Sequence, residues 1–194
     1  MLGMPDADKE QIAAWSGAVV KTLDPIISDD EIVAAIEGSR EMEAHIDQVI
    51  AWKRDHPADD LLSALIAAEE DGDRLSSIEL RDQVVLLFIA GHETTVNLIG
   101  TGIYELLRHP EQLAMLRDDP SLDANAIDEL LRFVSPVQMS RRVVLHDITI
   151  RDKTIPKGMF VLTGLASANR DPEKWGSTAD DLDLVREGAA QHVS

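Results

Sequence analysis

The centre of the chain places a carboxylate and a hydroxyl at adjacent positions within an apolar stretch. Glu93 and Thr94 lie just beyond the apolar run Val84–Ala90, and Gly91 stands between that run and the polar pair. Glycine weakens a helix interior by about 1 kcal/mol relative to alanine, and a buried carboxylate is costly unless it is partnered. A glycine also lets a flat ligand approach the backbone closely. The pattern predicts a niche that presents an acid and an alcohol to such a ligand.

Two other interpretations of this stretch remain open. The helix could emerge from the core here, with Glu93 at the surface. Alternatively, His92 and Glu93 could hold a metal ion. Adjacent positions of a helix point about 100° apart, so these two side chains could not easily share one metal.

A second pair that could carry charge chemistry is Glu129 and Arg132. Residues three apart lie on one face of a helix and can form an ion pair. Such pairs are usually exposed to solvent and contribute a few tenths of a kcal/mol.

Composition limits the class of protein. The 194 residues include 36 acidic and 18 basic side chains, giving a net charge of −18. This charge argues against non-specific binding to nucleic acid or anionic membranes, which requires basic surface. The apolar run 84–90 is far short of the roughly 18 apolar residues that span a bilayer, and no targeting segment is recognised. A cytoplasmic protein is therefore expected.

The chain has no cysteine, which excludes disulfides and cysteine-ligated metal sites within it.

One long helix must position the polar niche. Ser76 and Glu79 form a capping box at its start, and Pro110 ends it, so it is expected over 77–109. The run Val84–Ala90 is apolar on every face, which is typical of a helix enclosed within a protein. We therefore expect this helix to be the buried axis of its domain.

The remaining pattern predicts a mainly α fold with a small antiparallel β region. Further helices are expected over 9–23, 29–54, 60–70, 111–117 and 124–134. A loop at 2–8 and a turn at 70–73 are expected between or before helices. Short β-prone runs follow at 137–144, 148–150, 154–155 and 159–163. The helical part thus covers 1–136, and the small sheet with a meander-like segment covers 137–194.

These motifs together resemble the cytochrome P450 family, the haem-thiolate monooxygenases, in their soluble bacterial form. The resemblance rests on the hexapeptide Ala90–Thr95 after an apolar run, on Glu129-Leu-Leu-Arg132, and on Asn169-Arg-Asp-Pro172. It covers essentially the whole chain and implies a single partial cytochrome P450 domain over 1–194, built around one long central helix.

The resemblance has two departures. The family holds its iron through a cysteine thiolate, and this chain has no cysteine. An internal fragment is therefore expected, lacking the N-terminal part and the cysteine loop, with no metal ligand of its own. Many members also have an arginine that joins the Glu-x-x-Arg pair, and Asp181 stands at its position here. Either Arg170 or Arg186 could take the role of that arginine.

The resemblance implies the insertion of one oxygen atom of O₂ into a small organic substrate. The cofactor would be haem b, with electrons from NAD(P)H through a ferredoxin or similar donor, and neither nucleic acid nor membrane would be a partner. Thr94 would hydrogen-bond at the site of oxygen activation, and Glu93 would relay protons to it.

The resemblance also implies roles for other residues. Glu129 and Arg132 would form a buried structural ion pair. Haem would be bound by Ala90 and Gly91 against the porphyrin, and by Arg142 and His192 at its propionates, with Arg141 as an alternative to Arg142. The substrate pocket would be lined by Ile89, Val137, Gln138 and Met139.

A different class of function remains open, namely a non-catalytic helical interaction protein or a decayed gene product. The absence of cysteine favours this alternative, whereas the polar niche in the long helix favours an enzyme ancestry. We expect the isolated chain to be inactive in either case.

Overall fold

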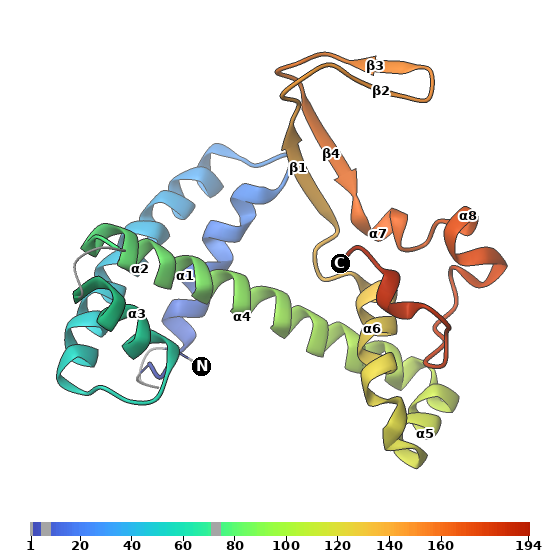
Figure 1. Ribbon diagram of the computed structural model, residues 1–194, viewed down its shortest axis with the longest axis horizontal. Coiled ribbons are helices and arrows are strands. Elements are labelled where there is room, and N and C mark those ends of the chain that lie inside the picture. The colour runs from blue at the N-terminus through green and yellow to red at the C-terminus, as the bar shows by residue number, and fades with distance from the viewer. Residues whose placement is uncertain (1, 5–8, 71–74) are drawn as a thin grey trace. The chain divides into compact units, whose positions relative to one another are not determined.

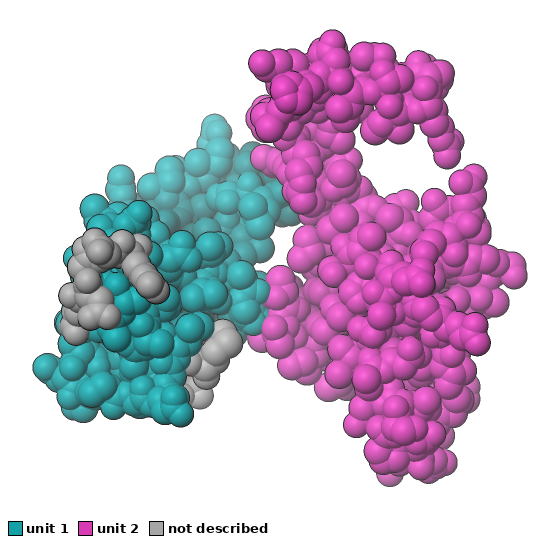
Figure 2. All heavy atoms as spheres, in the orientation of Figure 1, with its two compact units in different colours: residues 1–93 teal, residues 94–194 magenta. Residues whose placement is uncertain are grey.

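A computed structural model describes residues 2–4, 9–70 and 75–194, and Figure 1 shows the arrangement of their helices and strands. Residues 5–8 of the loop expected at 2–8, and residues 71–73 of the turn expected at 70–73, lie outside the described residues. The chain divides into two compact units, Met1–Glu93 and Thr94–Ser194 (Figure 2), and each is described by itself. The expectation of a single domain over 1–194 stays a prediction.

Helices dominate the described residues, as the sequence predicted. The α-helices are α1 Lys9–Val20, α2 Asp29–Asp55, α3 Leu61–Glu70, α4 Ser77–Arg108, α5 Pro110–Asp118, α6 Asp123–Val134, α7 Leu165–Ala168 and α8 Pro172–Trp175. Short 3₁₀ turns lie at Lys21–Leu23, Pro120–Leu122, Gly176–Thr178 and Ala189–Gln191. The strands are β1 Met139–Val143, β2 Ile148–Ile150, β3 Lys153–Ile155 and β4 Phe160–Gly164. The mainly α class with a small antiparallel β region is confirmed.

The β region forms two separate ladders where one small sheet was expected. β1 pairs with β4, β2 pairs with β3, and both pairs are antiparallel. The first ladder ends at Val143 and Phe160. Beyond it, the backbone N–H of Lys157 donates to the Asp147 side chain at 2.8 Å. This bond adds to the backbone hydrogen bonds that Val144 makes with Met159 and Gly158.

Both predicted capping boxes are present and set the starts of α2 and α4. The Glu31 N–H donates to Ser28 Oγ at 3.3 Å, and the Ser28 N–H donates to Glu31 Oε2 at 3.0 Å. Ser76 and Glu79 exchange the same two bonds at 3.3 and 2.8 Å. Hydrogen bonding from the Ser28 backbone, and then from Lys21, lowers the pKa of Glu31 to about 2. The ionised Glu31 carboxylate is thus the form that accepts the Ser28 N–H and completes the capping box.

The expectation that α4 is buried throughout is wrong for this chain. Leu80, Val84 and Leu106 are its buried apolar residues, whereas Glu93 and Thr94 are half-buried and several large apolar side chains are exposed. A helix that is apolar on every face needs neighbours on every face, and the described elements cover only part of it. By length and mean hydropathy (1.4), α4 is also the one helix in the described part of the chain that could cross a membrane.

The core of unit 1 contains a buried lysine. Lys53, near the end of α2, is 3 % exposed and forms an ion pair with Asp60. Its amine also donates to the Gly3 carbonyl at 3.2 Å. Gly3 has a φ of +58°, and a Cβ there would lie 2.1 Å from Asp60 Oδ2. The cluster therefore requires glycine and ties the start of the chain to α2.

Replacing Lys53 by methionine should destabilise unit 1. The substitution keeps the volume but leaves the Asp60 carboxylate without its cation, so Tm should fall by about 5 °C or more. Because Lys53 lowers the pKa of Asp60, the contribution of the pair is present at neutral pH and is lost as the pH falls through that lowered pKa. The difference in Tm should therefore shrink in acid. Arg54→Ala, which breaks the more exposed pair with Glu69, is the matched control and should have a smaller effect. Equal effects would contradict a special role for Lys53.

Candidate functional site

The polar niche predicted from the sequence lies at the middle of α4. Ala90 and Gly91 are exposed there, and Glu93 and Thr94 are half-buried. The Glu93 carboxylate extends toward α1, because its Oε1 lies 3.8 Å from where a Cβ of Gly17 would be. The carboxylate is thus neither enclosed nor fully in water.

His92 lies on a different side of α4 from Glu93. Its ring stacks on Phe88, one turn earlier, with centroids 5.4 Å apart and planes at 22°. Together with Gly91 the two rings line an open pocket of about 280 Å³, whose other lining residues are Leu2, Gly3, Met4 and Leu87. Among the described residues, no group of three or more His, Asp or Glu side chains could hold a metal ion.

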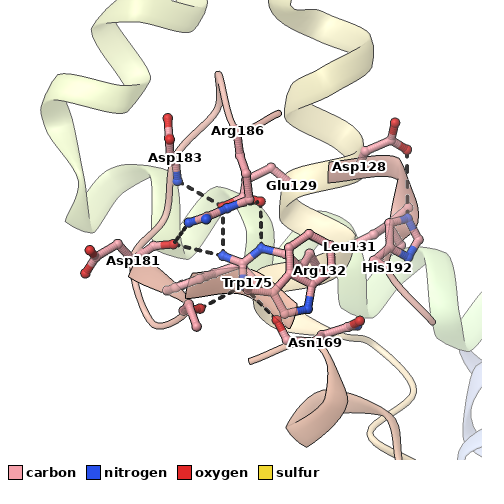
Figure 3. Close-up of polar contacts among 12 residues, drawn as sticks. Asp128, Glu129, Leu131, Arg132, Asn169, Trp175, Asp181, Asp183, Arg186 and His192 are labelled. Atoms are coloured by element: carbon pink, nitrogen blue, oxygen red, sulfur yellow. Dashed lines mark hydrogen bonds and ion pairs between the residues drawn. The ribbon is translucent and has the colours of Figure 1, made fainter. Parts of the chain in front are cut away.

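The second constellation is a buried ion pair on α6, shown in Figure 3. Glu129 and Arg132 are both 0 % exposed. Arg132 Nε donates to Glu129 Oε2 at 2.7 Å, and its Nη2 donates to Oε1 at 2.8 Å. Such a bidentate pair fixes geometry as well as charge. The common interpretation of this spacing as an exposed ion pair does not hold here.

Arg132 also donates hydrogen bonds to three backbone carbonyls in the C-terminal part of the chain. Its Nη1 donates to the carbonyls of Asn169 and Ala179, each at 2.7 Å. Its Nη2 donates to the Asp181 carbonyl at 2.8 Å. With the two bonds to Glu129, every N–H of the guanidinium has an acceptor. The buried charge is therefore satisfied and anchors the loops that follow α7 and α8.

Arg186 is the third charged member of this cluster. It is 8 % exposed, and its Nε lies 3.1 Å from both carboxylate oxygens of Glu129. Its Nη2 donates to the carbonyls of Thr178 and Asp181 at 2.8 and 3.0 Å. Asp181, which stands where the family often has an arginine, thus contributes its backbone oxygen to both guanidinium groups.

Arg170, the other arginine that the sequence left open, lies elsewhere. It donates to the Phe133 carbonyl at 2.9 Å and to Asp180 at 3.3 Å. Its guanidinium lies 4.2 Å from the centroid of the Phe133 ring. The structure therefore places Arg186, and not Arg170, on Glu129.

Two residues that the sequence did not indicate hold the Arg186 segment, one from α6 and the other from α5. Asn125 Nδ2 donates to the carbonyls of Leu184 and Arg186 at 2.7 and 3.2 Å. The Leu184 N–H donates to Gln112 Oε1 at 2.9 Å. Nothing in the local sequence around these two amides marks them, because their partners lie some sixty or seventy residues away in the chain.

The two residues proposed to face haem propionates lie in different surroundings. Arg142 is exposed on β1 and donates to Ser140 Oγ and to the Arg141 carbonyl. The His192 ring lies against α6, with its Nε2 3.8 Å from Asp128 Oδ1. Its Nδ1 accepts the Ser194 N–H at 3.1 Å.

The expected pocket-lining residues are divided between the two units. Ile89 is half-buried in unit 1, and three exposed residues belong to unit 2, namely Val137, Gln138 and Met139.

The comparisons with known proteins all match one family. The sequence matches the family model of cytochrome P450 over residues 30–186. It is 44% identical to vitamin D(3) 25-hydroxylase of Pseudonocardia autotrophica and 43% identical to cytochrome P450 CYP107DY1 of Priestia megaterium. These matches cover 97% and 96% of this chain and 45% of each relative.

A similar solved structure is that of P450BioI in complex with hexadec-9Z-enoic acid ligated acyl carrier protein. It matches with a TM-score of 0.86 and 37% identity, over 97% of this chain and 48% of that one. The chain thus spans about half the length of the relatives that it matches. By sequence and by fold, this chain belongs to the cytochrome P450 family.

Proposed function

We propose that this chain is part of a monooxygenase that inserts one oxygen atom of O₂ into a small organic substrate. The observation that carries the proposal is the family match over residues 30–186, which contains Gly91, Glu93 and Thr94 on α4. In this family haem supplies the activation of oxygen, and the protein supplies position and protons.

The residues present fit one side of a haem b group. Ala90 and Gly91 are exposed, so a flat ring can approach the backbone of α4 there. The exposed guanidinium of Arg142 is suited to a carboxylate group such as a haem propionate, and His192 would bind the other propionate by the family resemblance. None of the 194 residues is a cysteine, so the thiolate that holds the iron must be contributed from outside them.

The chemistry assigned to this chain is proton delivery. The Thr94 hydroxyl would donate a hydrogen bond at the site of oxygen activation, and the Glu93 carboxyl would replace the proton from solvent. Both side chains are half-buried, so a proton can reach them while their positions stay fixed by the helix. Glu129, Arg132 and Arg186 would hold the fold behind the site and take no part in proton transfer.

The remaining assignments follow the family. Electrons would come from NAD(P)H through a ferredoxin or similar donor, in the cytoplasm. Of the four residues that the family resemblance would assign to the substrate pocket, Ile89, Val137 and Met139 are apolar and Gln138 is polar, a composition that suits a largely apolar organic substrate. The names of the relatives, a vitamin D(3) hydroxylase and a structure with a fatty acyl chain, agree with that class.

A graft tests this proposal. The 194 residues would replace the matching segment of the Pseudonocardia vitamin D(3) 25-hydroxylase, which is 44% identical. The graft should bind haem and show the carbon monoxide difference band of thiolate-ligated haem. The 194-residue chain alone should show none, because it has no cysteine. A band from the chain alone, or a folded graft that binds no haem, would overturn the proposal. The unaltered 25-hydroxylase is the control.

A non-catalytic helical interaction protein is the second candidate, and the exposed apolar side chains of α4 favour it. A graft that folds but never binds haem would support this alternative.

A further inference from the structure

The backbone of Ser135 sets the direction in which the chain leaves α6. Residues 135–138 lie between the end of α6 at Val134 and the start of β1 at Met139. Ser135 has a φ of 37° and a ψ of 84°, in the left-handed region that residues other than glycine rarely adopt. Such a conformation persists only where the surrounding structure enforces it. The path of residues 135–138 therefore depends on what holds Ser135.

The side chain of Asn169 contacts Ser135 directly. Both residues are 1 % exposed. Asn169 Nδ2 donates to Ser135 Oγ at 2.9 Å, and Ser135 Oγ donates in turn to the Arg132 carbonyl at 3.1 Å. The hydroxyl is thus tied on one side to the last turn of α6 and on the other side to Asn169. Because a fully satisfied buried polar network is rigid, these bonds hold Ser135 in its left-handed conformation.

Asn169 is itself fixed from several directions. Its Nδ2 also donates to Ser194 Oγ at 2.7 Å, and its Oδ1 accepts the Val193 N–H at 2.9 Å. The Val193 N–H requires the oxygen of the amide on its side, which leaves both amide hydrogens for the two serine hydroxyls. The backbone carbonyl of Asn169 accepts from Arg132 at 2.7 Å (Figure 3). Asn169 therefore cannot shift without breaking several hydrogen bonds.

The helix that Asn169 ends also holds the far end of this segment. Asn169 is the C-cap of α7, and the N–H of Ala166 in α7 donates to the Gln138 carbonyl at 3.2 Å. The backbone of residues 135–138 is thus anchored at both ends by α7 and its cap. The side chains of residues 137–139 are exposed all the same. An anchored backbone that carries exposed side chains is suited to presenting them to a ligand in one fixed position.

We propose that Asn169 is a positioning residue that determines substrate specificity. By holding Ser135 in its left-handed conformation, the Asn169 amide sets where the side chains of residues 137–139 meet the substrate. The inference rests on the proposed function, in which Val137, Gln138 and Met139 line the substrate pocket.

The test is Asn169→Leu in the graft, which keeps the volume and removes all three side-chain hydrogen bonds of Asn169. The dissociation constant for vitamin D(3), measured by equilibrium dialysis, should rise by about tenfold, because the lining side chains are displaced. The ratio of the main hydroxylated product to other products should fall by about tenfold or more, since a shift of about 1 Å changes rates that much. The thiolate band should remain.

Asn125→Leu in the graft is the matched control. It removes another amide, which joins α6 to the Leu184 and Arg186 carbonyls and does not contact Ser135. Both leucine variants should lower Tm, because each loses hydrogen bonds that hold the C-terminal segment. Only Asn169→Leu should change the dissociation constant and the product ratio.

Ser135→Ala tests whether the effect of Asn169 passes through Ser135. This variant removes the acceptor hydroxyl and leaves the bonds of Asn169 to Val193 and Ser194 in place. It should change the product ratio in the same direction, and the double variant should change it no more than Asn169→Leu does. If the Asn169→Leu graft does not fold, Ser135→Ala carries the test.

The outcomes separate this inference from the proposed function. If Asn169→Leu keeps the thiolate band and changes neither the dissociation constant nor the product ratio, the inference is overturned and the proposed function stands. Equal changes in the Asn125→Leu graft would also overturn the inference, because lost stability would then account for them. A folded wild-type graft that binds no haem would overturn the proposed function, and this inference with it.

Discussion

Replacing Arg132 by alanine should lower the free energy of unfolding by about 3–5 kcal/mol, because the change leaves a buried carboxylate uncompensated. Glu129 is 0 % exposed and would keep only Arg186 as a cation. The Asn169 and Ala179 carbonyls would lose this donor at the same time, and the Asp181 carbonyl would keep only Arg186. Urea unfolding followed by circular dichroism measures the loss. Arg132→Lys should recover part of it, because an ammonium keeps the charge but cannot reach all of these acceptors.

The chain contains a matched control with the same spacing. Glu105 and Arg108 are also three apart, 3.3 Å from each other, but the arginine is 60% exposed. Arg108→Ala should cost less than about 1 kcal/mol. If the two alanine variants lost equal stability, the buried cluster around Glu129 would not be what holds this part of the fold together.

The bounds of the long helices could be predicted because local signals set them. Ser28 and Ser76 each accept from the backbone of a glutamate three residues later, and Pro110 begins a new helix after α4. The exposure of α4 could not be predicted in the same way. An apolar sequence indicates that a helix needs covering, but the sequence of the helix does not say which segment covers it.

Only part of the candidate site could be predicted from the sequence. The pairing of Glu129 with Arg132 follows from their spacing on one helix. The identity of the second arginine does not, because Arg186 lies 57 residues along the chain from Glu129. Its position depends on the path of the intervening loops, which Asn125 and Gln112 hold by their side-chain amides. Interactions of that kind carry no periodic pattern in the sequence.

Replacing Thr94 by alanine in the graft should uncouple electron use from product formation. The proposed account gives the Thr94 hydroxyl the last step of proton delivery, and a positioned proton donor contributes a factor of about 10² or more to such a step. NAD(P)H should still be consumed, because electron transfer does not need the hydroxyl. Thr95→Ala is the matched control, since that side chain is exposed and points about 100° away around the helix.

The amount of product formed per NAD(P)H consumed distinguishes these variants. If Thr94 delivers the proton, this ratio falls by about tenfold or more in the Thr94→Ala graft and stays near the wild-type value in the Thr95→Ala graft. An unchanged ratio in the Thr94→Ala graft, or an equal fall in both, would contradict the assignment of proton delivery to the centre of α4.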